Sequence, residues 1–451
     1  MSGSDRNVRV VFRWPCQILD LLRLWTPYCP KHDTAFTWNL PRFALFILIG
    51  FSATECLFSM LETVNILTDQ DGKTHTSSST IVAVFSTLPH NFLSFRGLLT
   101  LLVMARCQQQ RCQMIDRAHD LVRICIPQSD HRDLYRKWSR HSLVLTVYCF
   151  VGYFGFFLLN WAHKLMFLKL HLTDGLLVPP LDVPMPAWCA ILMQLLLIGV
   201  PYYLSKLVLV NMITFAMILK DAAVALNERL EQLVRPIFAL RSSLSVIDSD
   251  GDSCRELDGI LGELSELMVH RALHFKFVSA WNREFGSFLL TFYIMDVAVA
   301  AGILPVLLVG SELSRLLVTA KMIGFLVMLT FATALYVPLV LASEQAAITT
   351  AKLYKLEVAA RQVESASDHQ DSKQLVILLA DFKDITITSP LHFCGSKFFN
   401  INRKMLTTTC TALLSFGVIL LEFYYHLIRY EERSTPRQLY AEAFLNNATT
   451  P

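Results

Sequence analysis

The chain has 451 residues, of which 53% are hydrophobic and only 17% are charged, with a formal net charge of +3. This composition is too apolar for an ordinary soluble enzyme, and the apolar residues fall in blocks of about twenty, the length that crosses a bilayer. The basic residues are spread between these blocks rather than clustered, which argues against a nucleic-acid partner. We therefore expect an all-α membrane protein.

Seven apolar blocks are predicted to be transmembrane helices. Residues 1–39 carry charge throughout and hold no cleavable signal pattern, so the first span is expected to act as the signal. The region 40–343 holds spans 1 to 6, and 398–430 holds span 7, followed by a tail over 431–451. The first six spans are predicted at 40–67, 80–104, 138–162, 187–219, 285–309 and 316–342.

Spans 4, 5 and 6 are predicted to extend beyond the membrane, because their helical patterns continue past the apolar blocks. The pattern of span 4 runs on through Leu226, Leu230 and Leu233, and a second helical pattern leads into span 5. Residues 220–284 are therefore expected to form helical extensions of spans 4 and 5. The segment 344–397 would extend span 6 and add one short helix over 373–387.

The positions of the basic residues predict the orientation. Most of the 40 Lys and Arg residues lie before span 1 and in the segments between spans 2 and 3, 4 and 5, and 6 and 7. Since basic loops stay in the cytoplasm, the N-terminus and the extensions are expected in the cytoplasm and the C-terminus outside the cell. The tail contains the sequon Asn447-Ala-Thr449, which is predicted to be glycosylated if it reaches the outer side.

Three charged residues are predicted at mid-membrane depth: Glu55, Arg96 and Asp296. A charge at that depth normally pairs or lines water, so we expect Arg96 to pair with Asp296 or Glu55. Further polar residues fall in the outer halves of spans 2, 3 and 4. Together with Asp296 they either line a ligand pocket or hold the bundle together through hydrogen bonds between helices. These residues are His90, Asn91, Asn160, Trp161 and Gln194.

Span 7 differs from the others because a row of hydroxyl side chains runs through it, from Thr407 to Ser415. Such a row suits close helix packing or the wall of a water-filled path. Glu422 follows at its far end, where an acid is either a functional group or simply part of an interfacial anchor. We find no nucleophile elbow, phosphate loop or zinc motif, so no enzyme activity, cofactor or metal is expected.

The end of the chain resembles the arthropod gustatory receptor family. The segment 415–423, SFGVILLEF, aligns without gaps to the family signature T-Y, five mostly apolar residues, then Q-F. Upstream, FNINRKML at 399–406 is similar to the lead-in F-x-(apolar)-(Asp/Asn)-R-x-L-L, and PLHFCG at 390–395 is similar to P-L-x-F-x-x-G, one residue short. Ser415, Phe416 and Glu422 replace the Thr, Tyr and Gln of the signature, and Phe423 is unchanged.

The resemblance implies a ligand-gated, non-selective cation channel in the plasma membrane, built as a homotetramer or a hetero-oligomer with related receptors. Ser415 and Phe416 would take mid-pore positions, and Glu422 and Phe423 the outer end where the family gates. Tastants would bind in the outer half of helices 2 to 6, and the extensions would join the subunits. A metabotropic seven-helix receptor and a solute carrier are the alternatives.

Overall fold

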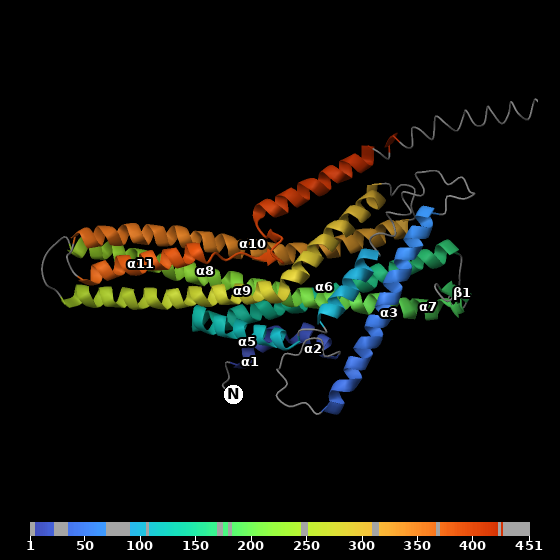
Figure 1. The fold of residues 1–451 in the computed structure, drawn as a ribbon, viewed down its shortest axis with the longest axis horizontal. Helices are drawn as coiled ribbons and strands as arrows, with labels where there is room; N and C mark the ends of the chain where they lie inside the picture. The colour runs from blue at the N-terminus through green and yellow to red at the C-terminus, as the bar shows by residue number, and fades with distance from the viewer. Residues whose placement is uncertain are drawn as a thin grey trace, which may run out of the picture.

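The computed structural model describes residues 5–21, 35–68, 91–104, 108–168, 175–178, 183–244, 251–308, 315–366, 370–422 and 425–426. The described chain is helical apart from two short strand pairs, and it forms an elongated bundle (Figure 1). One end of the bundle consists of α11 (Gln370–Thr388) and of the far ends of α8 (Val200–Leu244), α9 (Gly251–Leu308) and α10 (Arg315–Ala366); we call this part the extension. The fold class is the predicted all-α class.

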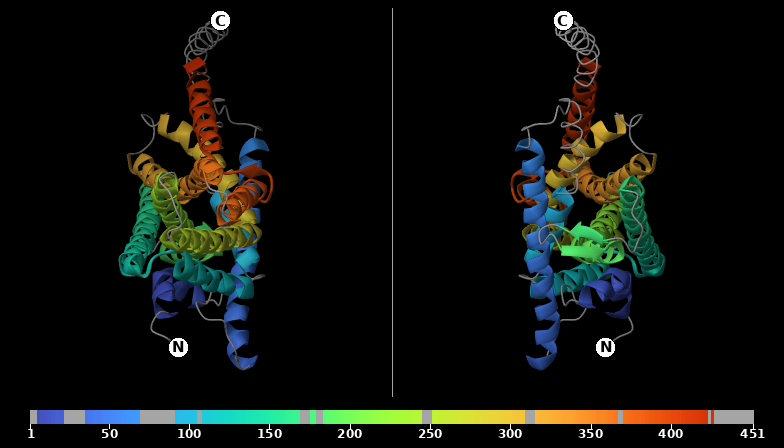
Figure 2. Two further views of the ribbon diagram at one scale, coloured as in Figure 1. Left: turned by 90° about the vertical axis from the view of Figure 1, so that its left-hand side faces the viewer. Right: turned by 90° about the vertical axis from the view of Figure 1, so that its right-hand side faces the viewer.

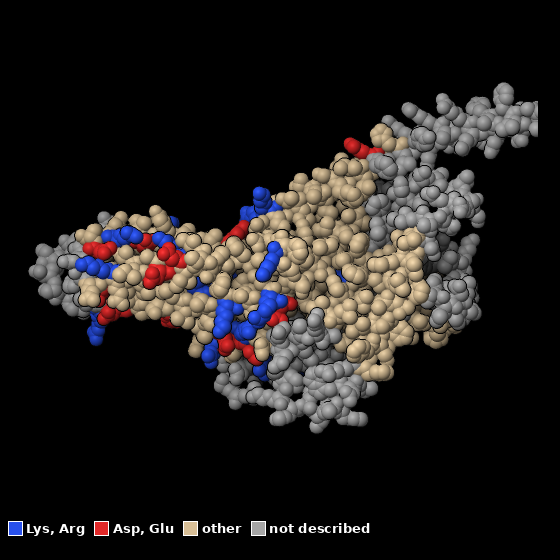
Figure 3. Space-filling view, in the orientation of Figure 1, with Lys and Arg blue, Asp and Glu red and all other residues tan. Residues whose placement is uncertain are grey.

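Six helices among the described residues are long and apolar enough to cross a membrane, and the shorter apolar helix Asn91–Met104 stands where span 2 was predicted. The first half of that span lies outside the described residues. Figure 3 shows a largely uncharged surface over the half of the molecule away from the extension, as a bilayer requires. The six are α3 (Ala35–Thr68), α6 (Gln128–Leu168), α8 (Val200–Leu244), α9 (Gly251–Leu308), α10 (Arg315–Ala366) and the C-terminal helix Arg403–Glu422.

Span 4 is a continuous helical path that contains one π-helical turn. It begins as α7 (Ala187–Gln194), passes through a π-helical turn (Leu195–Gly199) and continues as α8. Ahead of it, the segment that holds Pro184 and Pro186 contains an antiparallel pair of strands, β1 (Gly175–Val178) and β2 (Val183–Pro186). The π-turn lies close to Pro201, and such turns are frequent at functional sites.

The N-terminal segment contributes to the core. Its helices α1 (Asp5–Val11) and α2 (Arg13–Leu21) pack on α5 (Gln108–Cys125), α6 and α8. The Phe12 side chain is fully buried, and its ring lies 4.6 Å from that of Phe215. Sequence reasoning expected only a charged cytoplasmic segment here, because Arg side chains mask the short apolar face of each helix.

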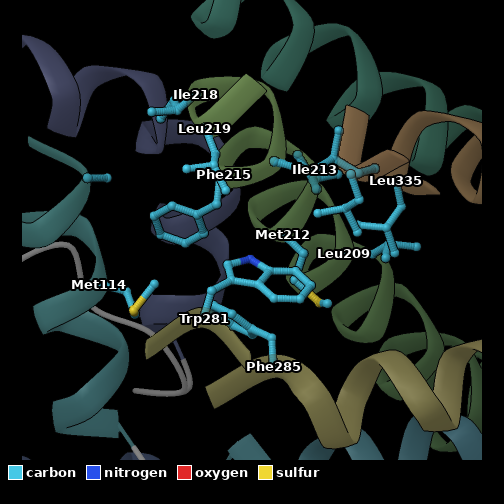
Figure 4. Packing of buried hydrophobic residues seen from close by; sticks show 14 of the residues in the cluster. Met114, Leu209, Met212, Ile213, Phe215, Ile218, Leu219, Trp281, Phe285 and Leu335 are labelled. Atoms are coloured by element: carbon cyan, nitrogen blue, oxygen red, sulfur yellow. The ribbon is translucent and has the colours of Figure 1, made fainter. Parts of the chain in front are cut away.

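The main core lies where α5, α8, α9 and α10 meet. Figure 4 shows Trp281 and Phe285 of α9 packed against Phe215 and Met212 of α8, with Met114 of α5 beside them. Trp281, Phe285 and Phe215 are all completely buried. Large aromatic side chains dominate such a core because each buries a large apolar area.

The extension has a separate apolar core. Leucines at three- and four-residue spacing on α8 (Leu226, Leu230, Leu233) meet matching positions on α9, α10 and α11 (Gln370–Thr388). This spacing places them on one helix face, as in a coiled-coil bundle. Charged residues cover the outside, which Figure 3 shows at this end. Glu357 of α10 binds Lys383 of α11 at 2.6 Å and Arg361 at 2.8 Å, which ties the two helices together.

A small hairpin leads into the C-terminal helix. Strands β3 (Cys394–Gly395) and β4 (Phe399–Asn400) pair around a turn in which Ser396 and Lys397 both have positive φ, 49° and 66°. The Phe398 amide donates to the Gly395 carbonyl at 2.9 Å and closes this turn. The C-terminal helix therefore begins at Arg403 rather than at residue 398, because the residues before it are extended.

Candidate functional site

The helix Asn91–Met104 approaches α8 very closely at Gly97. A Cβ atom at that position would lie 3.0 Å from the Pro201 Cβ and 3.2 Å from the Tyr202 amide nitrogen. A glycine is needed for this approach because any larger residue would push the helices apart. The close contact places the neighbouring residue, Arg96, in the interior of the bundle.

Arg96 forms an ion pair with Asp296 of α9. The Arg96 side chain is completely buried and the Asp296 side chain is 11% exposed, so both charges are removed from solvent. One terminal nitrogen of Arg96, Nη1, donates to Asp296 Oδ1, and the guanidinium lies 4.2 Å from the centre of the Phe292 ring. Of the two partners weighed from sequence, the structure pairs Arg96 with Asp296; no ion pair joins it to the half-buried Glu55 in the described part of the chain.

A second buried cation, Lys206 of α8, belongs to the same cluster. Its side chain is completely buried, and its ammonium lies 5.2 Å from the Tyr202 ring centre and 5.3 Å from that of Phe331. Electrostatic interactions join it to Arg96 and Asp296. Sequence reasoning assigned Lys206 no role, although a lysine in an apolar span was a visible signal.

Two tyrosines complete this cluster, which we call the buried charge cluster: Arg96, Asp296, Lys206, Tyr153 and Tyr336. The Tyr153 ring lies beside that of Tyr202, with 5.5 Å between ring centres and 45° between the ring planes. Tyr336 of α10 interacts electrostatically with Asp296 and Arg96. Helices from five different parts of the chain therefore bring ionisable or hydroxyl groups to one place in the bundle.

The pocket candidates from sequence do not converge in the same way. Asn91 bonds to α3, accepting from Ser59 and donating to Thr63 at 2.7 Å. Asn160 donates to the Phe156 carbonyl of its own helix at 2.9 Å. The predicted residue His90 lies outside the described residues. For Asn91, these contacts match the reading in which polar side chains hold helices together.

Trp161 and Gln194 occupy neighbouring parts of spans 3 and 4. Trp161 is buried, with 5% of its surface exposed, and Gln194 is half-buried at the end of α7, directly before the π-turn. No group of three or more metal-ligating side chains occurs in the part of the chain that the structure describes.

The C-terminal helix stands apart from the rest of the bundle, as both end views in Figure 2 show. Of the most apolar 18-residue stretch of this helix only 6% is buried, whereas 78% of the corresponding stretch of α8 is buried. Ser415 and Glu422 are exposed and Phe416 is half-buried, while Phe423 lies outside the described residues. An apolar helix that its own chain leaves uncovered needs other surroundings, such as lipid or another subunit.

Contacts with α9 and α10 hold the N-terminal half of the C-terminal helix. The hydroxyl groups of Tyr293 of α9 and Thr409 lie 2.6 Å apart, and Arg403 binds Glu344 of α10 at 3.0 Å. Tyr293 precedes Asp296 by three residues on α9, so both lie on the same side of that helix. Its ring centre lies 6.3 Å from that of Tyr336. Tyr293 thus links the C-terminal helix to the buried charge cluster.

The hairpin before the C-terminal helix is fixed to α9. Asn282 donates to the His392 carbonyl at 2.7 Å and accepts from the Cys394 amide at 3.0 Å. Burial raises the pKa of the Cys394 thiol, which stays protonated and donates to Asn400 at 3.1 Å. The two sequence segments that resemble the family motifs, 390–395 and 399–406, are therefore the parts that join the C-terminal helix to the bundle.

Comparisons with known proteins show the fold. No protein-family model matches the chain, and no curated protein matches it. Among solved structures, the insect olfactory receptor OR5 from Machilis hrabei matches with a TM-score of 0.63 at 12% sequence identity, over 91% of this chain and 98% of that chain. The same receptor in complex with eugenol matches with a TM-score of 0.61 at 12% identity and the same coverage. The chain therefore has the fold of an insect olfactory receptor along almost its whole length.

Proposed function

We propose that the chain is a subunit of a chemosensory receptor in which binding of a small molecule opens a cation-conducting pore. The observation that carries this proposal is the extent of the likeness, since 91% of the chain follows the fold of an insect olfactory receptor. The resemblance of residues 415–423 to the gustatory receptor signature favours a tastant as the stimulus. The apolar helices place the receptor in a membrane, and a receptor for external tastants belongs in the plasma membrane.

We propose a tetramer, either of this chain alone or with related receptors, in which the C-terminal helices line a central pore. The small buried share of this helix supports that arrangement, because neighbouring copies would cover its apolar residues. The extension offers a second surface between subunits. It exposes Ile377 and Tyr354, each at 61%, which is unusual for such side chains in a solvated bundle.

We place the ligand site among spans 2 to 6, next to the buried charge cluster. In the structure these spans are the helix Asn91–Met104, α6, α7 with α8, α9 and α10. A ligand there would change the relative stability of closed and open arrangements by its difference in affinity for the two. Tyr293 would transmit the effect of ligand binding to the C-terminal helix, because it contacts both Tyr336 of the cluster and Thr409 of that helix. The reaction is a conformational change, with no covalent step.

The channel proposal is tested by recording currents from the chain expressed in oocytes while tastants are applied. In a Cys410→Ala background, which removes the exposed native thiol of this helix, Ser415→Cys should make the current sensitive to a charged thiol reagent. The matched control is Leu413→Cys, because Leu413 packs against a buried cluster in α9 and α10. Solute uptake without single-channel currents would identify a carrier instead.

The orientation is tested by tags and by glycosylation. A tag at the C-terminus should be stained on intact cells and one at the N-terminus only after permeabilisation. The sequon at Asn447 lies outside the described residues; its modification should give a glycosidase-sensitive mass shift that Asn447→Gln removes. Surface staining of the N-terminal tag would favour the metabotropic receptor and contradict the channel topology.

The contact between Tyr293 and Thr409 is expected to couple ligand binding to the pore. Tyr293→Phe and Thr409→Val should each shift the ligand concentration for half-activation. The double variant should shift it by less than the sum, with a coupling energy of about 0.5–1.5 kcal/mol. The control cycle uses Tyr148→Phe and Thr330→Val, which remove a similar pair of hydroxyls, 3.3 Å apart, between α6 and α10. Equal coupling in both cycles would contradict a specific role for Tyr293.

A further inference from the structure

The buried charge cluster has two basic side chains and one carboxylate. Arg96 and Lys206 are both completely buried, and among the described residues Asp296 is the carboxylate that pairs with Arg96 and acts on Lys206. Burying a charge in an apolar bundle is expensive, because the ion loses its hydration. A bound anion would offset this cost.

The cluster also has unused hydrogen-bond donors. Within the described residues, the Nε and Nη2 atoms of Arg96, the Nζ atom of Lys206 and the hydroxyls of Tyr153 and Tyr336 have no hydrogen-bond partner. The Lys206 ammonium lies 5.2 Å and 5.3 Å from the centres of two aromatic rings. Buried donors are nearly always satisfied in proteins, so unsatisfied ones that lie together require an explanation.

The geometry of Arg96 indicates the shape of the missing partner. Asp296 takes Nη1, which leaves the edge formed by Nε and Nη2 open. These two nitrogens point their hydrogens in parallel, and this fork matches the two oxygens of a carboxylate. A spherical ion such as chloride could neutralise the charge but would not use both donors equally well.

We propose that the buried charge cluster is an anion site that binds the carboxylate of a small organic acid, with the open edge of Arg96, Lys206 and the Tyr336 hydroxyl as donors. This inference rests on the proposed function, because the stimulus of the receptor would supply the carboxylate. Asp296 holds the guanidinium in place from the other side, so it acts as a positioning residue and does not contact the ligand.

Binding is tested on the purified full-length protein in detergent, by thermal unfolding in a buffer whose only anion is a bulky sulfonate. The probes are acetate, butyrate and benzoate at constant ionic strength, each compared with its neutral amide. A ligand that binds only the folded state raises the melting temperature, and the rise grows with the logarithm of the ratio of ligand concentration to Kd. We expect the carboxylates to raise it and the amides to leave it unchanged.

Two variants show whether the cluster is the site. Lys206→Met keeps the length of the side chain and removes the charge, so the carboxylate affinity should fall by at least about tenfold. Tyr336→Phe keeps the ring and removes one donor, so the affinity should fall by about threefold to tenfold while the protein folds normally. The matched control is Tyr354→Phe, because Tyr354 lies on the extension with 61% of its surface exposed and should leave the affinity unchanged.

The outcomes distinguish a site for an organic carboxylate from a site for an inorganic anion such as chloride. If chloride stabilises the protein as strongly as the carboxylates, the cluster binds anions, but the proposal that it selects an organic carboxylate is wrong. If no anion stabilises the wild type, or if stabilisation persists in Tyr336→Phe and Lys206→Met, the proposal is overturned. Because unfolding is measured without ion conduction, stabilisation of a protein that carries no current would contradict the channel proposal and leave this one intact.

Discussion

Asp296→Ala should remove most of the protein from the cell surface, and it should do so more severely than Arg96→Ala. The first variant leaves Arg96 and Lys206 buried with no carboxylate, whereas the second leaves Asp296 with Lys206 as a neighbouring cation. Removing one partner of a buried ion pair costs about 3–5 kcal/mol. That is a large part of the total stability of about 5–15 kcal/mol of a typical domain.

The measurement is surface biotinylation of the tagged protein. The matched control is Arg283→Ala, because Arg283 is on the same helix as Asp296, pairs with a carboxylate at 3.1 Å and has a side chain that is 64% exposed. A charge swap, Arg96→Asp with Asp296→Arg, should restore part of the surface signal. Equal signals from Asp296→Ala and Arg283→Ala would show that the ion pair contributes little.

Glu422→Gln should strongly reduce the permeability to divalent cations relative to monovalent ones. In the proposed tetramer, four copies of the exposed Glu422 would form a ring around the axis. Rings of carboxylates attract cations, and divalent cations most strongly. The gustatory receptor signature that this segment resembles has Gln at this position, so the variant creates a neutral ring and should leave ligand activation in place.

The reversal potential in solutions of different calcium concentration measures this change. Asp258→Asn is the matched control, because Asp258 is an exposed carboxylate of the extension, far along the chain from the pore helix. An unchanged reversal potential in Glu422→Gln would place Glu422 against lipid headgroups or a neighbouring helix, outside the ion path.

The positions of the helices could be predicted from the sequence because each apolar block is long enough to indicate one membrane-spanning helix. The structure gives α9 over Gly251–Leu308, and α10 over Arg315–Ala366, as single helices that run from the spans into the extension. The leucines at 226, 230 and 233 correctly indicated the apolar core of the extension. These features depend on local periodicity, which a sequence shows directly.

The composition of the candidate site was harder to predict, because it depends on how helices rotate against one another. Periodicity shows which residues of one helix share a face, but not which face meets which neighbour. Asn91 thus meets Ser59 and Thr63 of α3, whereas Lys206 meets the aromatic rings of Tyr202 and Phe331. The N-terminal helices were missed because each spans only about two turns, so its apolar period covers few residues.

The continuity of α9 has a mechanical consequence. With 58 residues at about 1.5 Å of rise each, its path is about 87 Å long, and Figure 1 shows that it bends before its C-terminal end. A change in the angle of this bend would move the C-terminal end of α9 relative to the extension. In the proposed tetramer, such a movement would alter the packing between subunits.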